Sequence, residues 1–241
     1  TGSVVSVPKD RLSNLPVTNI LQAIQGTTAG LNISQGSSVP GSSASVQIRG
    51  INSINASNSP LIILDGVPFF GVTNDINPND ISSIEVLKDA SAVAIYGTRG
   101  SNGVILITSK RGKKDGKPTI KISSYMGIEE MSNPLTPMGA DAYVQKYADF
   151  LIANGLSQTS VLPNASEVEN YEAGITTDWL DEATKSGVLQ EHNISISSGN
   201  ESSQYYFSAS HLKQDGVVKG NNFKKSQFFR SYSYEPLFCT L

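Results

Sequence analysis

The sequence predicts an α+β domain, with a small mixed β-sheet and short helices, followed by antiparallel β-strands. Short apolar runs bounded by turn residues recur over residues 45–107, with brief helical stretches between them. After a charged, turn-rich segment at residues 111–118, the pattern changes to apolar residues alternating with small polar ones. Charged residues make up 16% of the 241 residues, against about 25% in a typical soluble domain. This low charge favours strands with one polar but uncharged face.

In the first half, the helix expected at residues 20–24 has Thr18 or Asn19 as its cap and Gly26 after its end. A second helix is expected from Ala90 to Tyr96, capped by Asp89 and ended by Gly97. Four strands are expected here, at residues 45–49, 61–64, 84–87 and 104–107.

In the second half, a one-sided strand is expected over residues 120–128 and a helix over Asp141–Asn154. Residues 157–176 are polar and are expected to form a loop. Two alternating strands around residues 192–197 and 205–210 are joined by a turn that contains Gly199 and Asn200. The expected organisation is a first domain over 1–112, a linker over 113–118, strands and loops over 119–229 and an aberrant tail over 230–241.

Composition excludes several classes of function. The net charge of −3 does not fit a strongly basic nucleic-acid-binding protein. Cys239 is the single cysteine, which excludes an intrachain disulfide and a multi-cysteine zinc site, and two histidines leave little for metal or acid–base chemistry. No apolar run is long enough for a transmembrane helix. The chain begins without Met or a signal-peptide pattern, so any targeting signal is expected upstream or already removed.

Local motifs give no catalytic residue, metal ligand or cofactor. Gly97, Gly100 and Gly103 precede a strand, whereas a dinucleotide-binding run follows one, so a tight turn is expected. The polar segment over residues 75–86 fails the calcium-loop template, because Asp80 stands at the glycine position and Val86 at the twelfth. Two alternatives stay open: a soluble extracellular carbohydrate-binding β-module, and a hydrolase with its site in residues 65–80.

Several segments resemble one family. Residues 45–51, 60–68, 76–97 and 98–112 are similar to the plug domain of TonB-dependent outer-membrane transporters of the SusC/RagA type. Downstream, residues 177–182, 192–197 and 205–218 resemble the segments that lead into that family's first barrel strands. The resemblance implies a plug domain followed by an incomplete transmembrane β-barrel, since a barrel of about 22 strands needs far more residues than follow Pro118.

The resemblance also implies a function without covalent chemistry. Such transporters import oligosaccharides or peptides across the outer membrane of Gram-negative bacteria, driven by the inner-membrane TonB complex, and pair with a SusD-like surface lipoprotein. The complete barrel contacts outer-membrane lipid, and no nucleic acid is involved. The TonB box is expected upstream of Thr1, and the chain is expected to be a piece of a transporter that does not transport by itself.

Two groups of site residues follow from the same resemblance. Arg49 and Lys88 each end a strand and correspond to plug cations that pair with barrel carboxylates. The substrate-facing loops of the plug would carry six further residues, Asn52, Asn55, Asn58, Phe69, Phe70 and Asn74. For the two phenylalanines, packing against the barrel wall is the alternative to stacking on a sugar.

Overall fold

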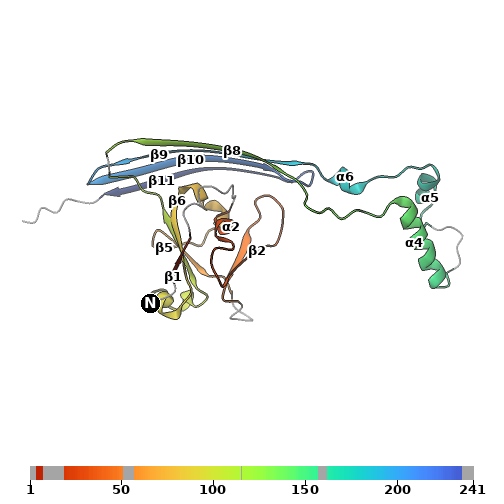
Figure 1. Cartoon of the computed structure of the whole chain (residues 1–241), viewed down its shortest axis with the longest axis horizontal. Helices are drawn as coiled ribbons and strands as arrows, with labels where there is room; N and C mark the ends of the chain where they lie inside the picture. The colour runs from red at the N-terminus through yellow and green to blue at the C-terminus, as the bar shows by residue number, and fades with distance from the viewer. Residues whose placement is uncertain (1–3, 8–18, 51–56, 115, 157–161, 235–241) are drawn as a thin grey trace, which may run out of the picture. The chain divides into compact units, whose positions relative to one another are not determined.

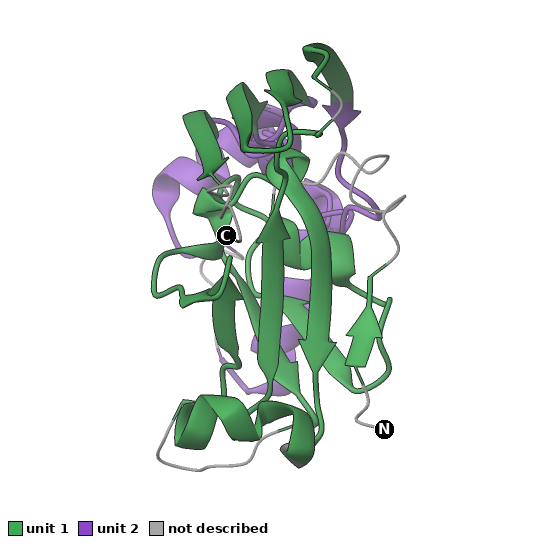
Figure 2. Cartoon of the chain, turned by 90° about the vertical axis from the view of Figure 1, so that its left-hand side faces the viewer, with its two compact units in different colours: residues 1–127, 188–215, 222–241 green, residues 128–187, 216–221 purple. Residues whose placement is uncertain are grey.

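The computed structural model describes residues 4–7, 19–50, 57–114, 116–156 and 162–234. The chain divides into two compact units, shown in green and purple in Figure 2. Unit 1 contains residues 1–127, 188–215 and 222–241, and unit 2 contains residues 128–187 and 216–221. The predicted linker at 113–118 therefore lies inside unit 1, because it is held against strands that come much later in the sequence.

The N-terminal domain of unit 1, the described residues up to Lys114, is built on a five-stranded mixed sheet of order β1-β6-β7-β4-β5 (Figure 1). Strands β4 and β7 run parallel, and the other neighbours are antiparallel. Their continuous apolar runs suit a sheet that is covered on both faces. The strands are β1 Val4–Ser6, β4 Leu61–Leu64, β5 Val67–Pro68, β6 Ile81–Leu87 and β7 Val104–Ser109.

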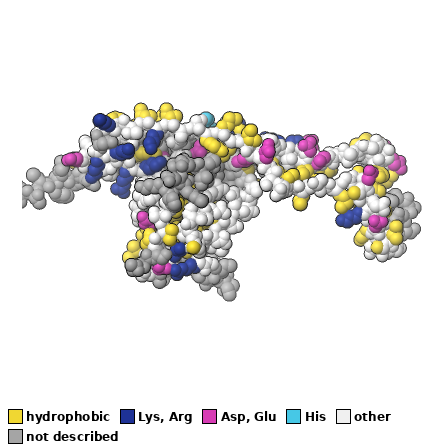
Figure 3. Space-filling view, viewed as in Figure 1, with side chains coloured by type: hydrophobic (Ala, Val, Ile, Leu, Met, Phe, Trp, Pro, Cys, Tyr) yellow, Lys and Arg dark blue, Asp and Glu magenta, His cyan; other side chains and the backbone are white. Residues whose placement is uncertain are grey.

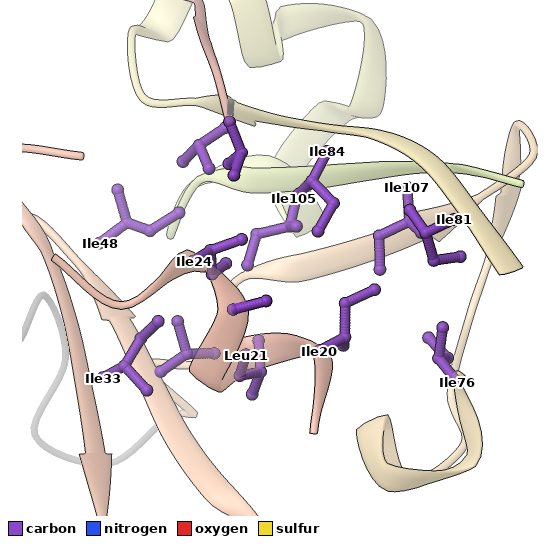
Figure 4. Close-up of a cluster of buried hydrophobic side chains, with 14 residues drawn as sticks. Ile20, Leu21, Ile24, Ile33, Ile48, Ile76, Ile81, Ile84, Ile105 and Ile107 are labelled. Atoms are coloured by element: carbon purple, nitrogen blue, oxygen red, sulfur yellow. The ribbon is translucent and has the colours of Figure 1, made fainter. Parts of the chain in front are cut away.

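Helix α2 (Ile20–Ile24) covers one face of this sheet. Its predicted cap is confirmed, since Asn19 Oδ1 accepts from the Leu21 amide at 2.8 Å. Figure 4 shows Ile20 and Ile24 of α2 beside side chains of β6 and β7 in one apolar cluster. A hairpin of β2 (Leu31–Gln35) and β3 (Ala44–Ile48) packs against the same cluster. The domain core therefore consists largely of isoleucine, leucine and valine from these elements.

Short helical turns connect the strands. The helix expected over residues 90–96 is shorter: α3 covers Ala90–Val93 and a 3₁₀ helix, η3, covers Ala94–Gly100. Gly97 breaks the turn with φ 61° and ψ −151°, a backbone conformation that suits glycine. Two single 3₁₀ turns precede β6, namely η1 (Thr73–Asp75) and η2 (Pro78–Asp80).

The remaining strands form a four-stranded antiparallel sheet of order β11-β10-β9-β8, here called the wall sheet. Its strands are β8 Thr119–Glu129, β9 Gly187–Gly199, β10 Ser203–Asp215 and β11 Asn222–Tyr234. Strands β10 and β11 pair along their full length, from Ser203 opposite Tyr234 to Asp215 opposite Asn222. A mixed sheet with short helices followed by antiparallel strands confirms the predicted fold class.

The two faces of the wall sheet differ. Directly opposed residues share a face, so the pairs of Phe207 with Ile196 and of Phe207 with Arg230 define one face, called the outward face. The other, inner face carries Tyr206, Ser208 and their partners, which are more buried. Along β11 the alternation of half-buried and exposed residues is complete from Asn222 to Tyr234.

The predicted tail boundary at residue 230 is wrong. Residues 230–234 continue β11, because Arg230, Tyr232 and Tyr234 keep its alternation and pair with β10. Residues 235–241, including Cys239, lie outside the described residues.

Unit 2 contains three helices, α4 (Ala140–Ala153), α5 (Ala165–Glu172) and α6 (Trp179–Ala183). Helix α4 confirms the helix predicted over residues 141–154. Helix α5 contradicts the loop predicted over residues 157–176: it lacks a strong apolar stripe, but three of its eight residues are Glu, which favours helices. Tyr171 of α5 donates to Asp141 of α4 at 3.0 Å. No helix of the described residues is long and apolar enough to cross a membrane.

Candidate functional site

A buried carboxylate, Asp80, lies where the N-terminal domain contacts the inner face of the wall sheet. Turn η2 presents it: Pro78 opens the turn, and the side chain of Asn77 accepts from the Asn79 amide at 2.9 Å. Asp80 is 4% exposed, and its Oδ1 accepts from the Tyr206 hydroxyl of β10 at 3.0 Å. The hydrogen bond thus joins residues that are 126 positions apart in the sequence.

Neighbouring strands of the wall sheet contact the same segment. Asn79 Nδ2 donates to Glu191 Oε1 of β9 at 2.6 Å. From β11, Lys225 Nζ donates to the Asn74 carbonyl oxygen at 2.7 Å. Gln227 Nε2 of the same strand donates to the carbonyl oxygen of Asp75 at 2.5 Å. Residues 74–80 therefore form a docking segment that contacts β9, β10 and β11.

The end of β7 holds this docking segment from the other side. The Lys110 amide donates to the Asp80 carbonyl oxygen at 2.7 Å, and Lys110 Nζ donates to the Asn79 carbonyl oxygen at 2.5 Å. The preceding residue, Ser109, is fixed by Asp65, whose carboxylate accepts from its amide at 2.9 Å and its hydroxyl at 2.7 Å. Asp80 is thus positioned by the core sheet as well as by the wall sheet.

Burial and compensating contacts set the protonation of this cluster. Burial raises the pKa of the Asp80 carboxyl, while hydrogen bonds from Ser208 and Tyr206 and the charges of Lys110 and Lys225 oppose that rise. Burial likewise lowers the pKa of Lys110, although the Asp80 charge acts against it. The anion is therefore held by polar partners from both sides, and its ionisation state is coupled to the contact itself.

The contact between the docking segment and the wall sheet is polar, and some of its polar atoms have no hydrogen-bond partner among the described residues. A cavity of about 110 Å³ lies beside Asp80 and is lined by the docking segment and β11. Within it, Asn77 Nδ2 and Gln227 Oε1 are buried without a hydrogen-bond partner among the described residues. Such an interface is held by a few hydrogen bonds, each worth about 0.5–1.5 kcal/mol, or about 1.5–3 kcal/mol where one partner is charged.

The two predicted cations lie together on another side of the N-terminal domain. Arg49 and Lys88 line one cavity of about 490 Å³. Arg49 forms an ion pair with Asp89, and Lys88 Nζ donates to the Ala29 carbonyl oxygen at 2.8 Å. Asp89 stands at the cap position of α3 but makes no capping hydrogen bond through its side chain. The pairing of either cation with a barrel carboxylate stays a prediction.

The predicted substrate-facing residues do not share one environment. Phe70 is 76% exposed, and the Arg99 guanidinium lies 5.8 Å from its ring centroid. Phe69 instead packs in part against the isoleucine-rich core, and Asn58 is half-buried. Asn52 and Asn55 lie outside the described residues.

Asn74 differs from the prediction that it faces a substrate. It is 8% exposed, and its carboxamide bonds Asn19 and the Gly41 carbonyl oxygen, the latter at 2.6 Å. The side chain of Asn74 therefore links η1 to the cap of α2 and to the β2–β3 loop. Its burial follows from these two polar partners, which a purely local sequence pattern does not reveal.

Sequence reasoning missed the docking segment as a functional element. Residues 75–86 have the polar composition of a calcium loop but fail its template. In the structure their polar side chains cap turns and contact the wall sheet. Within the part of the chain that the structure describes, no group of three or more His, Cys, Asp or Glu residues gathers as a metal site. Regular apolar–polar alternation in β10 was the available signal, since it placed Tyr206 on the face opposite Phe207.

Comparison with known proteins gives one family. The model of the TonB-dependent Receptor Plug Domain matches residues 1–104. TonB-dependent receptor P3 of Formosa agariphila is 38% identical over 230 residues, covering 93% of this chain and 21% of that protein. TonB-dependent receptor SusC of Bacteroides thetaiotaomicron is 34% identical over 246 residues, covering 99% of this chain and 23% of that protein.

Comparison with solved structures gives the same family. The RagAB peptide importer in its open-open state superposes with a TM-score of 0.83 at 30% identity, over 98% of this chain and 29% of that chain. The siderophore receptor PirA from Pseudomonas aeruginosa, 19% identical with a TM-score of 0.57, shares the fold. The chain thus spans between a fifth and a quarter of the length of these curated relatives.

Proposed function

Since the chain belongs to the TonB-dependent receptors of the SusC/RagA type, we propose that it forms the plug and the first wall strands of an outer-membrane importer. In this proposal the N-terminal domain is the plug, and the wall sheet is the beginning of the barrel that surrounds it. The transporter in which the chain lies takes up oligosaccharides or peptides, using energy delivered by the TonB complex.

The outward face of the wall sheet is the observation that carries this proposal. Large apolar side chains stand exposed on it, including Ile122 at 76% and Phe228 at 86%. A soluble carbohydrate-binding module would bury such a surface or place charges on it. Strands that are apolar on one face and polar on the other are typical of a membrane barrel with a polar lumen.

The docking segment gives the plug a defined attachment inside the lumen. Its hydrogen bonds to Glu191, Tyr206 and Lys225 fix residues 74–80 against three neighbouring strands. Because these contacts are polar, they exchange for water more readily than an apolar core separates. A plug attached in this way is rigid at rest and able to shift when it is pulled.

The relatives bear on substrate and partners. One structural relative is the RagAB peptide importer. By analogy we assign a SusD-like surface lipoprotein as partner and peptides or oligosaccharides as cargo. On the plug, the exposed Phe70 and Arg99 line a cavity of about 780 Å³, and an aromatic ring beside a cation suits stacking on a sugar or a peptide.

Uptake measurements test the proposal. The transporter that contains these residues is produced together with a SusD-like lipoprotein in the outer membrane of a Gram-negative host, and uptake of labelled peptide and oligosaccharide mixtures is followed. Uptake that stops when a protonophore collapses the proton gradient is the expected result. Uptake that is unaffected by the protonophore, or a protein that fractionates away from the outer membrane, would refute the proposal.

A further inference from the structure

Positive charge gathers where the plug passes into β8. Arg111, Lys113, Lys114 and Lys117 are all exposed, and they are here called the basic rim. Asp115 is the acidic residue in this stretch of sequence, so cations are in excess. Figure 3 shows Lys and Arg side chains gathered at the left-hand end of the wall sheet.

Backbone contacts fix the basic rim to one end of that sheet. The Gly116 amide donates to the Gly199 carbonyl oxygen at 2.7 Å. Gly112 packs so closely that a Cβ added there would lie 2.1 Å from the Ser198 carbonyl oxygen. Because Gly199 ends β9 and Ser203 begins β10, the basic rim borders the turn between these strands.

The outward face carries tyrosines at this same end. Tyr205 lies opposite Tyr232, and Tyr234 follows at the end of β11. Tyr232 and Tyr234 are 64% and 62% exposed. Tyrosine rings at the edge of an apolar band are typical of the level at which lipid headgroups begin. Arg230 lies on the outward face two residues before Tyr232, and its long side chain can extend toward that level.

We propose that the basic rim binds the phosphates of anionic phospholipids at the membrane surface. The inference rests on the proposed function, because it requires the outward face to lie in a bilayer. Ammonium and guanidinium groups bind phosphate oxygens through charge-assisted hydrogen bonds. A cluster of cations immediately beyond an aromatic band is placed where headgroup phosphates lie, and it thereby fixes the height of the sheet in the membrane.

Vesicle binding of the full chain tests this assignment. The chain, kept in mild detergent, is diluted into phosphatidylcholine vesicles with or without phosphatidylglycerol, and the bound fraction is measured by flotation. The variant K113S/K114S/K117S removes three cations of the basic rim. The matched control, K213S/K219S/K224S, removes three cations near the other end of β10 and β11, where Lys213 pairs with Asp215 at 3.3 Å.

The expected result is a preference for vesicles that contain phosphatidylglycerol. The rim variant should lose about tenfold or more in partitioning onto them, while the control keeps it and high salt abolishes the difference. Equal losses of vesicle binding for both variants, or a preference for phosphatidylglycerol that the rim variant keeps in full, would overturn the proposal. Equal binding to both vesicle types would refute only the proposal that the basic rim binds anionic lipid. Binding to neither vesicle type would also contradict the proposal that the wall strands enter a membrane.

Discussion

Replacing Tyr206 with phenylalanine should loosen the plug from the wall sheet without unfolding the plug itself. The Tyr206 hydroxyl donates to Asp80 at 3.0 Å, and its ring lies 6.1 Å from that of Phe229. Phenylalanine keeps the ring and its packing. The substitution removes the hydrogen bond from the hydroxyl to a buried carboxylate, together with the hydrogen bonds of that hydroxyl with Ser195 and Ser208.

The expected magnitude follows from the partners that Asp80 keeps. A hydrogen bond to a charged group contributes about 1.5–3 kcal/mol. Ser208 also donates to Asp80, so the carboxylate is not left without a partner. The lower end of the range, about 1.5 kcal/mol, therefore applies, which corresponds to roughly a tenfold change in the opening equilibrium.

Amide exchange on the full chain measures this opening. The Gly116 amide, which donates to the Gly199 carbonyl oxygen of wall strand β9 at 2.7 Å, should exchange about tenfold faster in Y206F. The Arg49 amide, which donates to Gly30 at 2.9 Å beside the distant β2–β3 hairpin, should keep its rate. The control is Y205F, which alters the neighbouring tyrosine on the outward face. Equal acceleration at both amides, or the same effect in Y205F, would refute the reasoning.

Three further predictions concern other parts of unit 1. Because burial raises the pKa of Asp80, the wild type should lose stability as the pH rises from the ordinary aspartate pKa through the raised one. Urea unfolding of D80N should not show this dependence of the unfolding free energy on pH. The same dependence in D80N as in the wild type would contradict the assignment. Gly112→Ala should destabilise the chain by about 2 kcal/mol or more in thermal unfolding, because its Cβ would lie 2.1 Å from a backbone oxygen. Gly36→Ala, with no atom within 4 Å of the added Cβ, should be neutral. Reversing both charges in R49E/K88E should change the unfolding free energy by no more than about 1 kcal/mol, because Arg49 pairs at the surface; a much larger loss would show that these cations stabilise the plug core.

Local sequence patterns were sufficient for elements whose signals are local. The cap of α2 follows from Asn19 standing directly before an apolar stretch, and α4 follows from its aromatic stripe. Alternation also predicted β8, β9 and β10 of the wall sheet, because apolar residues alternate with polar or small ones in each of them. It did not predict β11, whose last residues were assigned to a tail. Helix α5 escaped detection because its helical signal lies in residue propensity rather than in periodicity.

The candidate site could not be predicted because its contacts are long-range. Nothing near Asp80 in the sequence indicates Tyr206 as its partner, and the same holds for Asn79 with Glu191. At Asp89 a local signal gave a wrong prediction. Its position before α3 predicts a capping hydrogen bond, but its carboxylate accepts from Arg49 instead. The partner of a polar side chain depends on which groups the tertiary structure brings close to it. The periodicity of apolar residues, in contrast, can be read within each helix or strand alone.

The two kinds of contact around the docking segment determine how the plug would respond to a load. Inside the plug, Asn74 joins η1 to Asn19 and Gly41, and the core consists largely of isoleucines such as Ile84, which is fully buried. Burying one such side chain stabilises the fold by about 1.5–3 kcal/mol, and many contribute together. The contact with the wall sheet depends instead on a few hydrogen bonds of about 1–3 kcal/mol each. A plug that is pulled should therefore separate from the four strands of the wall sheet before its own core opens.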